Sequence, residues 1–206
     1  MPSPEFETIR DLRRAQIIAE ARVLVAREGL AGLTIGTLEK RLPFSRGVIT
    51  HHFRNKDEIV DAVLDSALDE IDAATFSDLA GAGSVEEMVR AVLRSKVHGF
   101  LQVVEACQIL VSFWGRIPTD THAAERNAAL FRRYRGQAVT LFEAGLASGV
   151  LREDLDIEAM AALMVGQVLG IVTQALFEPG AIDVETAVEA AASAIIASAR
   201  TPAPAP

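Results

Sequence analysis

The chain has 206 residues, half of them hydrophobic, so it can bury a substantial core and is not an intrinsically disordered protein. Its formal net charge of -8 argues against a protein that binds nucleic acid indiscriminately, because such binding needs a broad basic surface. One cysteine, Cys107, excludes an internal disulfide framework and a cysteine-rich metal site.

The composition favours helices throughout. Ala, Leu, Val and Glu are abundant, aromatic residues make up 5% of the chain, and no run of alternating β-branched residues occurs. The first predicted helix covers residues 8–28, where Ile17, Ala21 and Leu24 recur on one face. Gly29 then suits a C-terminal cap.

Two short helices are predicted next, separated by a turn. Thr34 is the expected N-cap of a helix over residues 35–42, and Pro43 ends it because the residue before a proline avoids helical geometry. The second short helix begins at Ser45, whose hydroxyl can cap the first turn, and runs to about Phe53.

A long helix is predicted from residue 56 to about 71, capped by Asn55 with Glu58 reaching back. A glycine-rich boundary follows at 78–83, and Ser84 with Glu87 forms another capping box. Further helices are expected at about 84–101, 103–115, 120–148, 157–177 and 183–199, and residues 201–206 form a tail that we expect to be disordered.

Charge is distributed unevenly along the chain. Residues 1–60 hold ten Lys or Arg against eight Asp or Glu, whereas the remainder holds ten against twenty. Residues 40–56 carry five Lys or Arg, two His and no acid. An anionic partner is therefore expected at this one segment.

The two short helices, held by the helix before them, form a predicted helix-turn-helix, whose second helix enters the major groove of DNA. In that helix Val48, Ile49 and Phe53 can pack inward, which leaves the intervening polar positions available to DNA. Gly47 costs about 1 kcal/mol relative to alanine inside a helix, and its use would be to let the backbone approach the duplex.

These residues carry a family resemblance. The end of the first helix, VAREG over 25–29, then LTI over 33–35 and FSRGVITHHFRNKDE over 44–58, resemble the DNA-binding domain of the TetR family of bacterial transcriptional regulators. The resemblance covers about residues 12–65. Pro43 and Phe44 stand where the family usually has Gly-Val, and Thr50 stands where it usually has Tyr.

The resemblance assigns roles to seven residues. It implies that phosphates are met by Thr34, Thr50, His51 and Lys56, and that base edges face Ser45, Arg46 and Gly47. An arginine can bond a guanine through two donors, in keeping with the assignment of Arg46. The alternatives are a solvated basic face and two ordinary surface histidines. A metal site at His51 and His52 is disfavoured because neighbouring residues on a helix point about 100° apart.

Members of this family pair the DNA-binding domain with a helical domain that dimerises and often binds a small molecule, and residues 141–157 resemble the stretch before the dimerising helices. The uncharged run 159–177 is close to the length of a membrane span, but Glu158 and Glu178 flank it. We therefore predict a helix buried on most sides by protein. Its expected dimer contacts are Met160, Leu163, Met164, Gly166, Gln167, Gly170 and Ile171.

A pocket for an effector is predicted among residues 84–148. Its candidate contacts are His98, Phe100, Phe113, Trp114, Arg116, Phe131 and Tyr134. Aromatic residues at helical spacing are more often core than pocket, so the core is the alternative for these side chains. The apolar majority indicates a mostly hydrophobic effector.

The sequence thus predicts an all-α protein of about nine helices. An N-terminal three-helix DNA-binding domain over 1–55, with its motif at about 34–53, is joined by a connecting helix at 56–78 to a ligand-binding and dimerisation domain at 84–200. The predicted function is that of a cytoplasmic homodimeric repressor, released from a palindromic double-stranded DNA operator by a small molecule. No membrane association, metal or other cofactor is expected.

The alternatives are a helical enzyme or binding protein with an apolar pocket, or a DNA-binding protein without a ligand. An enzyme is disfavoured because no nucleophile motif or phosphate loop occurs.

Overall fold

The computed structural model describes residues 9–75 and 83–200. Within these ranges it contains nine α-helices and no strand beyond one isolated bridge between Leu151 and Arg200, which confirms the all-α prediction. The predicted tail at 201–206 and most of the boundary at 78–83 lie outside the described residues.

The described residues form two compact units. The first unit contains the described residues up to Ile71 together with Glu105–Ala123, and the second contains the described residues of 72–104 and 124–200. The division falls inside α4 (Lys56–Ala74), and α6 (Val104–Trp114) belongs almost entirely to the first unit.

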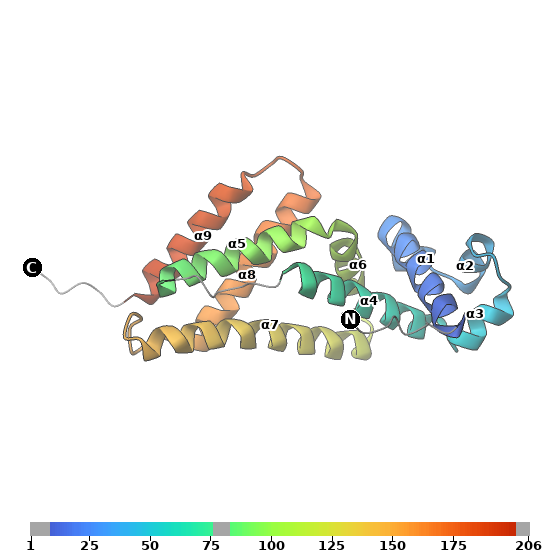
Figure 1. Cartoon of the computed structure of the whole chain (residues 1–206), viewed down its shortest axis with the longest axis horizontal. Coiled ribbons are helices and arrows are strands. Elements are labelled where there is room, and N and C mark those ends of the chain that lie inside the picture. Colours follow the sequence, from blue (N-terminus) through green and yellow to red (C-terminus); the bar gives the residue numbers. More distant parts are fainter. Residues whose placement is uncertain (1–8, 76–82, 201–206) are drawn as a thin grey trace, which may run out of the picture. The chain divides into compact units, whose positions relative to one another are not determined.

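The first unit begins with three helices packed on one another, α1 (Ile9–Gly32), α2 (Ile35–Arg41) and α3 (Arg46–His52), as Figure 1 shows. The predicted stripe of α1 is buried, as are Leu38 of α2 and Ile49 of α3. Gly29 has φ 68°, a left-handed conformation that favours glycine, and it breaks α1 where the sequence predicts the end of the helix.

Pro43 is compatible with this packing. Leu42 has an extended backbone, as a residue before proline should, and its N–H still bonds to the carbonyl oxygen of Leu38 at 3.0 Å. Pro43 itself is exposed, so α2 and α3 pack together although the family's usual residues are absent from the turn.

Arg22 ties α1 to α4 and α6. Its guanidinium donates to Ser66 Oγ at 2.9 Å, pairs with Glu70, and lies 3.1 Å from Glu105 Oε1. Only 12% of the Arg22 side chain is exposed, so these partners satisfy a largely buried cation. The network fixes three helices of the first unit against one another.

The second unit is built on α5 (Val85–Gln102), α8 (Ile157–Phe177) and α9 (Val184–Ala199), which pack together, with α7 (Thr121–Ala147) running alongside (Figure 1). Gly99 of α5 allows one close approach, because a Cβ at this position would lie 2.3 Å from the carbonyl oxygen of Ala74. The end of α4 therefore crosses α5 with backbone against backbone.

Burial of α8 is less than predicted. The helix is apolar and long enough to cross a bilayer by composition, with a mean hydropathy of 1.8, yet only 33% of its most apolar window is buried within this chain. The expectation of a helix covered by protein on most sides is therefore wrong for the single chain, because α5 and α9 cover only part of its circumference. An uncharged helical face remains open.

Candidate functional site

Helix α3 presents one polar face to solvent. Arg46, Gly47, Thr50 and His51 are exposed, and Ser45 is exposed just before the helix. The opposite face is closed, because Ile49 and Phe53 are 0% and 2% exposed. This separation follows from helical spacing, which turns the apolar positions toward α1 and α2. The structure thus brings together five of the seven residues assigned to DNA contact.

The N-terminus of α3 is not capped by the Ser45 hydroxyl, as the sequence predicts, but by another side chain. Ser45 is the N-cap by position and backbone geometry, but its hydroxyl makes no capping bond. Glu39 of α2 takes that role, because its Oε1 accepts from the Arg46 N–H at 3.0 Å. A carboxylate can satisfy the free amide of a first helical turn across a short turn of chain. The Ser45 hydroxyl consequently has no role in the start of its own helix.

The two assigned threonines differ from Ser45, since both hydroxyls already bond within the chain. Thr34 Oγ1 accepts from the Thr37 N–H at 3.0 Å and caps α2, as predicted. Thr50 Oγ1 donates to the carbonyl oxygen of Arg46 at 3.1 Å. A phosphate at Thr50 would need that hydroxyl to turn away from the helix backbone.

Lys56 lies apart from the polar face of α3. Its Nζ donates to the carbonyl oxygen of Leu30 at 2.7 Å, and the side chain is half-buried. The ammonium therefore satisfies a carbonyl at the end of α1 while α4 begins. Nearby, Asn55 Oδ1 accepts from the Glu58 N–H at 2.9 Å, which confirms Asn55 as the cap of α4.

Three arginines that the sequence analysis did not assign also belong near α3. The pKa of His52 is lowered by partial burial and then by the charges of His51, Arg10, Arg13 and Arg14. Arg14 also lies over the Phe53 ring, 5.0 Å from its centre. The signal was present in the sequence, since these arginines recur at helical spacing on one face of α1, but it lay outside the basic segment 40–56.

The His51 and His52 rings pack edge to face with centroids 5.4 Å apart. Within the described ranges no group of three or more His, Cys, Asp or Glu side chains could hold a metal ion. The pair lies near Arg10, Arg13 and Arg14 in the first unit.

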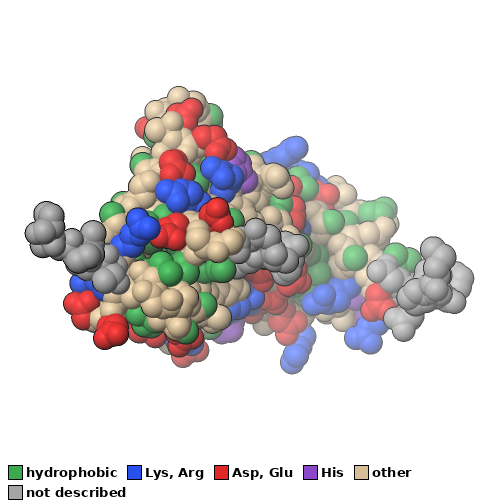
Figure 2. All heavy atoms as spheres, turned by 60° about the vertical axis from the view of Figure 1, so that its left-hand side comes forward, with side chains coloured by type: hydrophobic (Ala, Val, Ile, Leu, Met, Phe, Trp, Pro, Cys, Tyr) green, Lys and Arg blue, Asp and Glu red, His purple; other side chains and the backbone are tan. Residues whose placement is uncertain are grey.

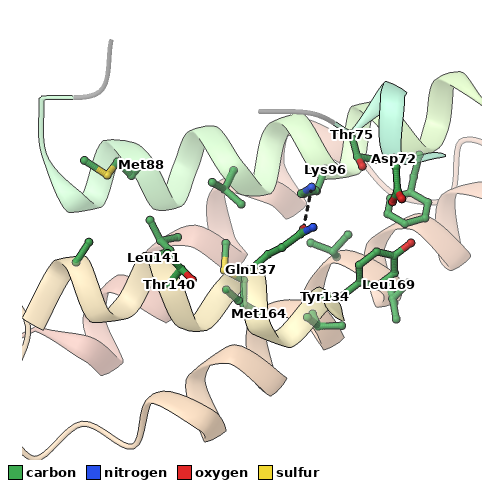
Figure 3. A pocket seen from close by; sticks show the side chains of 16 residues that line it. Asp72, Thr75, Met88, Lys96, Tyr134, Gln137, Thr140, Leu141, Met164 and Leu169 are labelled. Atoms are coloured by element: carbon green, nitrogen blue, oxygen red, sulfur yellow. Dashed lines mark hydrogen bonds between the residues drawn. The ribbon is translucent and has the colours of Figure 1, made fainter. Parts of the chain in front are cut away.

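A cavity of about 570 Å³ lies within the second unit, between α5, α7 and α8 (Figure 3). This volume suits a small organic molecule. Most of the wall is apolar, from the side chains of Met88, Val92, Phe100, Ala138, Leu141, Ala144, Met164, Val165, Val168 and Leu169. The polar lining side chains are Asp72, Thr75, Lys96, Tyr134, Gln137 and Thr140.

The charged groups of the cavity are unequally paired. Asp72 is held by Arg133 through two contacts, at 2.8 and 3.1 Å. Lys96 Nζ donates to Gln137 Oε1 at 3.4 Å, a long hydrogen bond, and Figure 3 shows the two side chains pointing at each other from α5 and α7. Burial lowers the pKa of Lys96; Asp72 opposes that shift and Arg133 adds to it.

Two of the seven residues proposed for the effector, Phe100 and Tyr134, line this cavity. His98 lies on another face of α5, where its Nε2 is 2.6 Å from Glu185 Oε1 of α9. Arg90 and Arg94 of α5 also pair with acids of α9. Figure 2 shows basic, acidic and histidine side chains next to one another on the surface.

Phe113, Trp114 and Arg116 belong to the first unit, where Arg116 pairs with Asp57 at 3.0 Å. Phe131 is half-buried on α7 and does not line the cavity. The polar end of the cavity carries no signal in the sequence, because Lys96 is separated along the chain from Asp72 and Gln137 and only the packing of three helices joins them.

The residues proposed for dimer contact divide between two faces of α8. Met160, Met164 and Ile171 are buried within the chain, and Met164 lines the cavity. Leu163 is 41% exposed, Gly166 is exposed, and Gln167 and Gly170 are partly exposed. A Cβ at either glycine would meet nothing within 4 Å, so no packing inside the described chain requires a glycine there.

Two protein families match successive parts of the chain. Residues 17–63 match a family described as bacterial regulatory proteins of the TetR family. Residues 85–199 match the C-terminal family of BetI-type transcriptional repressors, from the first residue of α5 to the last of α9. The second match spans more than half of the chain. The chain belongs to the TetR family.

Curated relatives of this TetR-family chain carry the name HTH-type transcriptional regulator BetI. The protein from Burkholderia thailandensis is 27% identical over 109 residues, which are 52% of this chain and 56% of the relative. The protein from Paraburkholderia phymatum is 28% identical over 106 residues, 52% of this chain and 53% of the relative. The chain thus matches about half the length of these relatives, whose family consists of transcriptional regulators and not enzymes.

Solved structures share the fold. A TetR regulator from Chloroflexus aurantiacus superposes with a TM-score of 0.74 at 24% identity, covering 91% of this chain and 94% of that chain. A transcriptional regulator from Saccharomonospora viridis, crystallised with choline, gives 0.74 at 18% identity, covering 93% of this chain and 99% of that one. These likenesses extend over both units.

Proposed function

We propose that this TetR-family chain is a BetI-type repressor that binds a DNA operator through α3 as a homodimer and is released by a small effector. The observation that carries the proposal is the face of α3, where Ser45, Arg46, Gly47, Thr50 and His51 are exposed together over a closed apolar side. A short helix of this kind suits the major groove, with Arg46 placed to bond a guanine through two donors.

Phosphate contacts would surround this helix. Arg10, Arg13 and Arg14 extend the basic surface, and Thr34 and Lys56 are proposed to act at its edge. Because Lys56 already bonds the Leu30 carbonyl, its first role is to position the end of α1, and its remaining N–H groups can meet a phosphate. The acidic remainder of the chain would keep DNA at this surface alone.

A second copy of the chain is the proposed partner of α8. Its exposed face carries no charge from Ala159 to Phe177, and Gly166 and Gly170, four residues apart, would let another helix approach closely. The exposed face of α9 is also rich in small residues, including Ala190, Ala194 and Ala197. Two-fold symmetry would then require a palindromic operator with half-sites roughly 34–36 Å apart.

The cavity of the second unit is the proposed effector site. Asp72, near the end of α4, contributes to its wall, while Lys56 begins the same helix four residues after α3 ends. One helix, α4, therefore runs from the wall of the proposed effector site to the residues that follow the recognition helix. An effector that prefers a conformation unsuited to the operator would release DNA in proportion to that preference. Because the proposed partner is a DNA operator, we propose that the protein acts in the cytoplasm.

The test is an electrophoretic mobility assay with the DNA upstream of the chain's own gene. We expect specific binding at moderate salt, and Arg46→Ala should cost about 1–3 kcal/mol while relaxing base preference at one position of each half-site. Arg132→Ala, an exposed arginine of α7, is the matched control and should leave binding unchanged. Equal losses of Arg46→Ala on operator and random DNA would show that Arg46 contacts phosphate instead.

A further inference from the structure

Lys96 is the one lysine of the cavity wall, and its ammonium is poorly satisfied. Among the described residues its one hydrogen-bond acceptor is Gln137 Oε1, at 3.4 Å, although an ammonium carries three donors. Among residues 9–75 and 83–200, no carboxylate lies within 4.0 Å of Lys96 Nζ. A half-buried cation in a mostly apolar wall is costly unless something pairs with it.

Asp72 is the acid whose charge acts on Lys96, and it already pairs with an arginine. Asp72 stabilises the Lys96 ammonium, but its two oxygens lie 2.8 and 3.1 Å from the Arg133 guanidinium. Asp72 and Arg133 cancel, so the described lining residues leave one net positive charge at this end of the cavity, that of Lys96. Burial also lowers the pKa of Lys96, because a charged ammonium is less stable where water is partly excluded.

Most of the wall away from this charge is apolar, and Thr140 beside Leu141 is a polar exception. Met88 and Leu141 lie toward the other end of the cavity in Figure 3, with Met164 on the side of α8. The cavity therefore has one cationic position beside Gln137 and a long apolar surface. Its charge complement is a molecule with one anionic end and an apolar body.

We propose that the effector is an amphipathic anion, with a carboxylate held by Lys96 and Gln137 and an acyl or aryl chain along α5, α7 and α8. This assignment rests on the proposed function only for the step of DNA release. Gln137 can turn its amide to donate to the second carboxylate oxygen. A quaternary ammonium such as choline, present in the Saccharomonospora viridis structure, would place a second positive charge against Lys96.

The test measures direct binding by calorimetry without DNA, using decanoate, decanol and decyltrimethylammonium as probes. We expect decanoate to bind roughly tenfold or more tightly than decanol, because only decanoate forms the charge-assisted bond. Lys96→Met should abolish this preference while keeping the affinity for decanol, and Lys96→Arg should retain it. Lys40→Met, an exposed lysine of α2, is the control and should leave all three affinities unchanged.

Three results would overturn the assignment: tighter binding of decyltrimethylammonium than of decanoate, equal affinities for decanoate and decanol, or no binding of any probe. Thermal melts of each variant show whether the fold is retained. DNA release is measured separately. If decanoate binds through Lys96 but leaves an operator complex intact, the effector mechanism fails and the anion site stands. If the wild-type chain binds no operator, the repressor function fails while the calorimetry still decides the ligand class.

Discussion

Gly47 weakens the helix that carries it, yet the fold does not require a glycine at this position. A Cβ there would meet only Ser45 Oγ, at 3.7 Å, an ordinary contact, and its φ is not in the left-handed region. Glycine costs up to about 1 kcal/mol relative to alanine in a helix. The residue is therefore better explained by the proposed approach of DNA than by the packing of α3.

Gly47→Ala should separate these two roles. The substitution should raise the free energy of unfolding by up to about 1 kcal/mol, measured by urea denaturation. It should also weaken operator binding by roughly tenfold, about 1.4 kcal/mol, because the methyl group would stand between backbone and duplex. Gly136→Ala, at an open exposed position of α7, is the control and should change stability alone. Unchanged operator affinity of Gly47→Ala would contradict the role assigned to Gly47.

Cys107 illustrates a residue whose chemistry is suppressed by its surroundings. It is 3% exposed on α6, and burial, with a smaller effect of the Glu70 charge, raises the pKa of its thiol to about 12. The thiolate is the reactive form, so almost none is present near neutral pH. The cysteine therefore acts as a small apolar core residue.

This predicts that iodoacetamide will not modify Cys107 in the native protein at pH 8 within hours. In guanidinium chloride the same thiol should react at the rate of an ordinary cysteine, since both burial and the pKa shift are lost. Mass spectrometry of the intact chain measures the modification at this single cysteine. Rapid labelling under native conditions would show that α6 opens locally and would contradict the burial described above.

At the scale of elements, local sequence accounts for most of the helix starts. Thr34 caps α2 with Thr37, and Ser84 caps α5 with Glu87, both as reciprocal capping boxes. Such caps depend on residues three apart, so they can be found from the sequence. Helix α3 is the exception, because the group that caps it, Glu39, comes from the preceding helix.

The crossing of α4 and α5 depends on one residue. Gly99→Ala should lower the free energy of unfolding by about 1–3 kcal/mol, because its Cβ would stand 2.3 Å from the Ala74 carbonyl oxygen and the backbone would have to move. Urea denaturation measures the change, with Gly136→Ala as the neutral or stabilising control. Equal stability of both variants would mean that the end of α4 yields easily, and that the crossing is not a fixed contact.

For the whole molecule, the open face of α8 is the proposed contact between two copies of the chain. Gly166→Leu should be tolerated by the single chain, because nothing lies within 4 Å of a Cβ at that position, but it would hold apart two copies packed through α8. We expect sedimentation to give twice the chain mass of 22.1 kDa for the wild type and a monomer for the variant. Gly136→Leu, equally open on α7, should remain dimeric. A dimeric Gly166→Leu would place the interface elsewhere.

Local sequence patterns predicted every helix of the described ranges, with most ends within about two residues of those observed, and the polar face of α3. The ends of α1 and α4 are the exceptions, since these helices run about four and three residues past the predicted positions. Hydrophobic periodicity, capping residues and helix breakers act over a few residues, so they can be recognised in the sequence alone. The same reasoning underlies the family resemblance, since the ordered residues from Gly29 to Lys56 are close in the chain.

Which distant groups meet depends on how the helices pack. Their packing joined Lys96, Gln137 and Asp72 in one cavity, turned His98 toward Glu185, and assigned Phe113, Trp114 and Arg116 to the other unit. It also divided the α8 residues between the chain's own core and an open face. The physical reason is that helix period fixes which residues share a face, whereas the identity of the neighbour on that face depends on how whole helices pack.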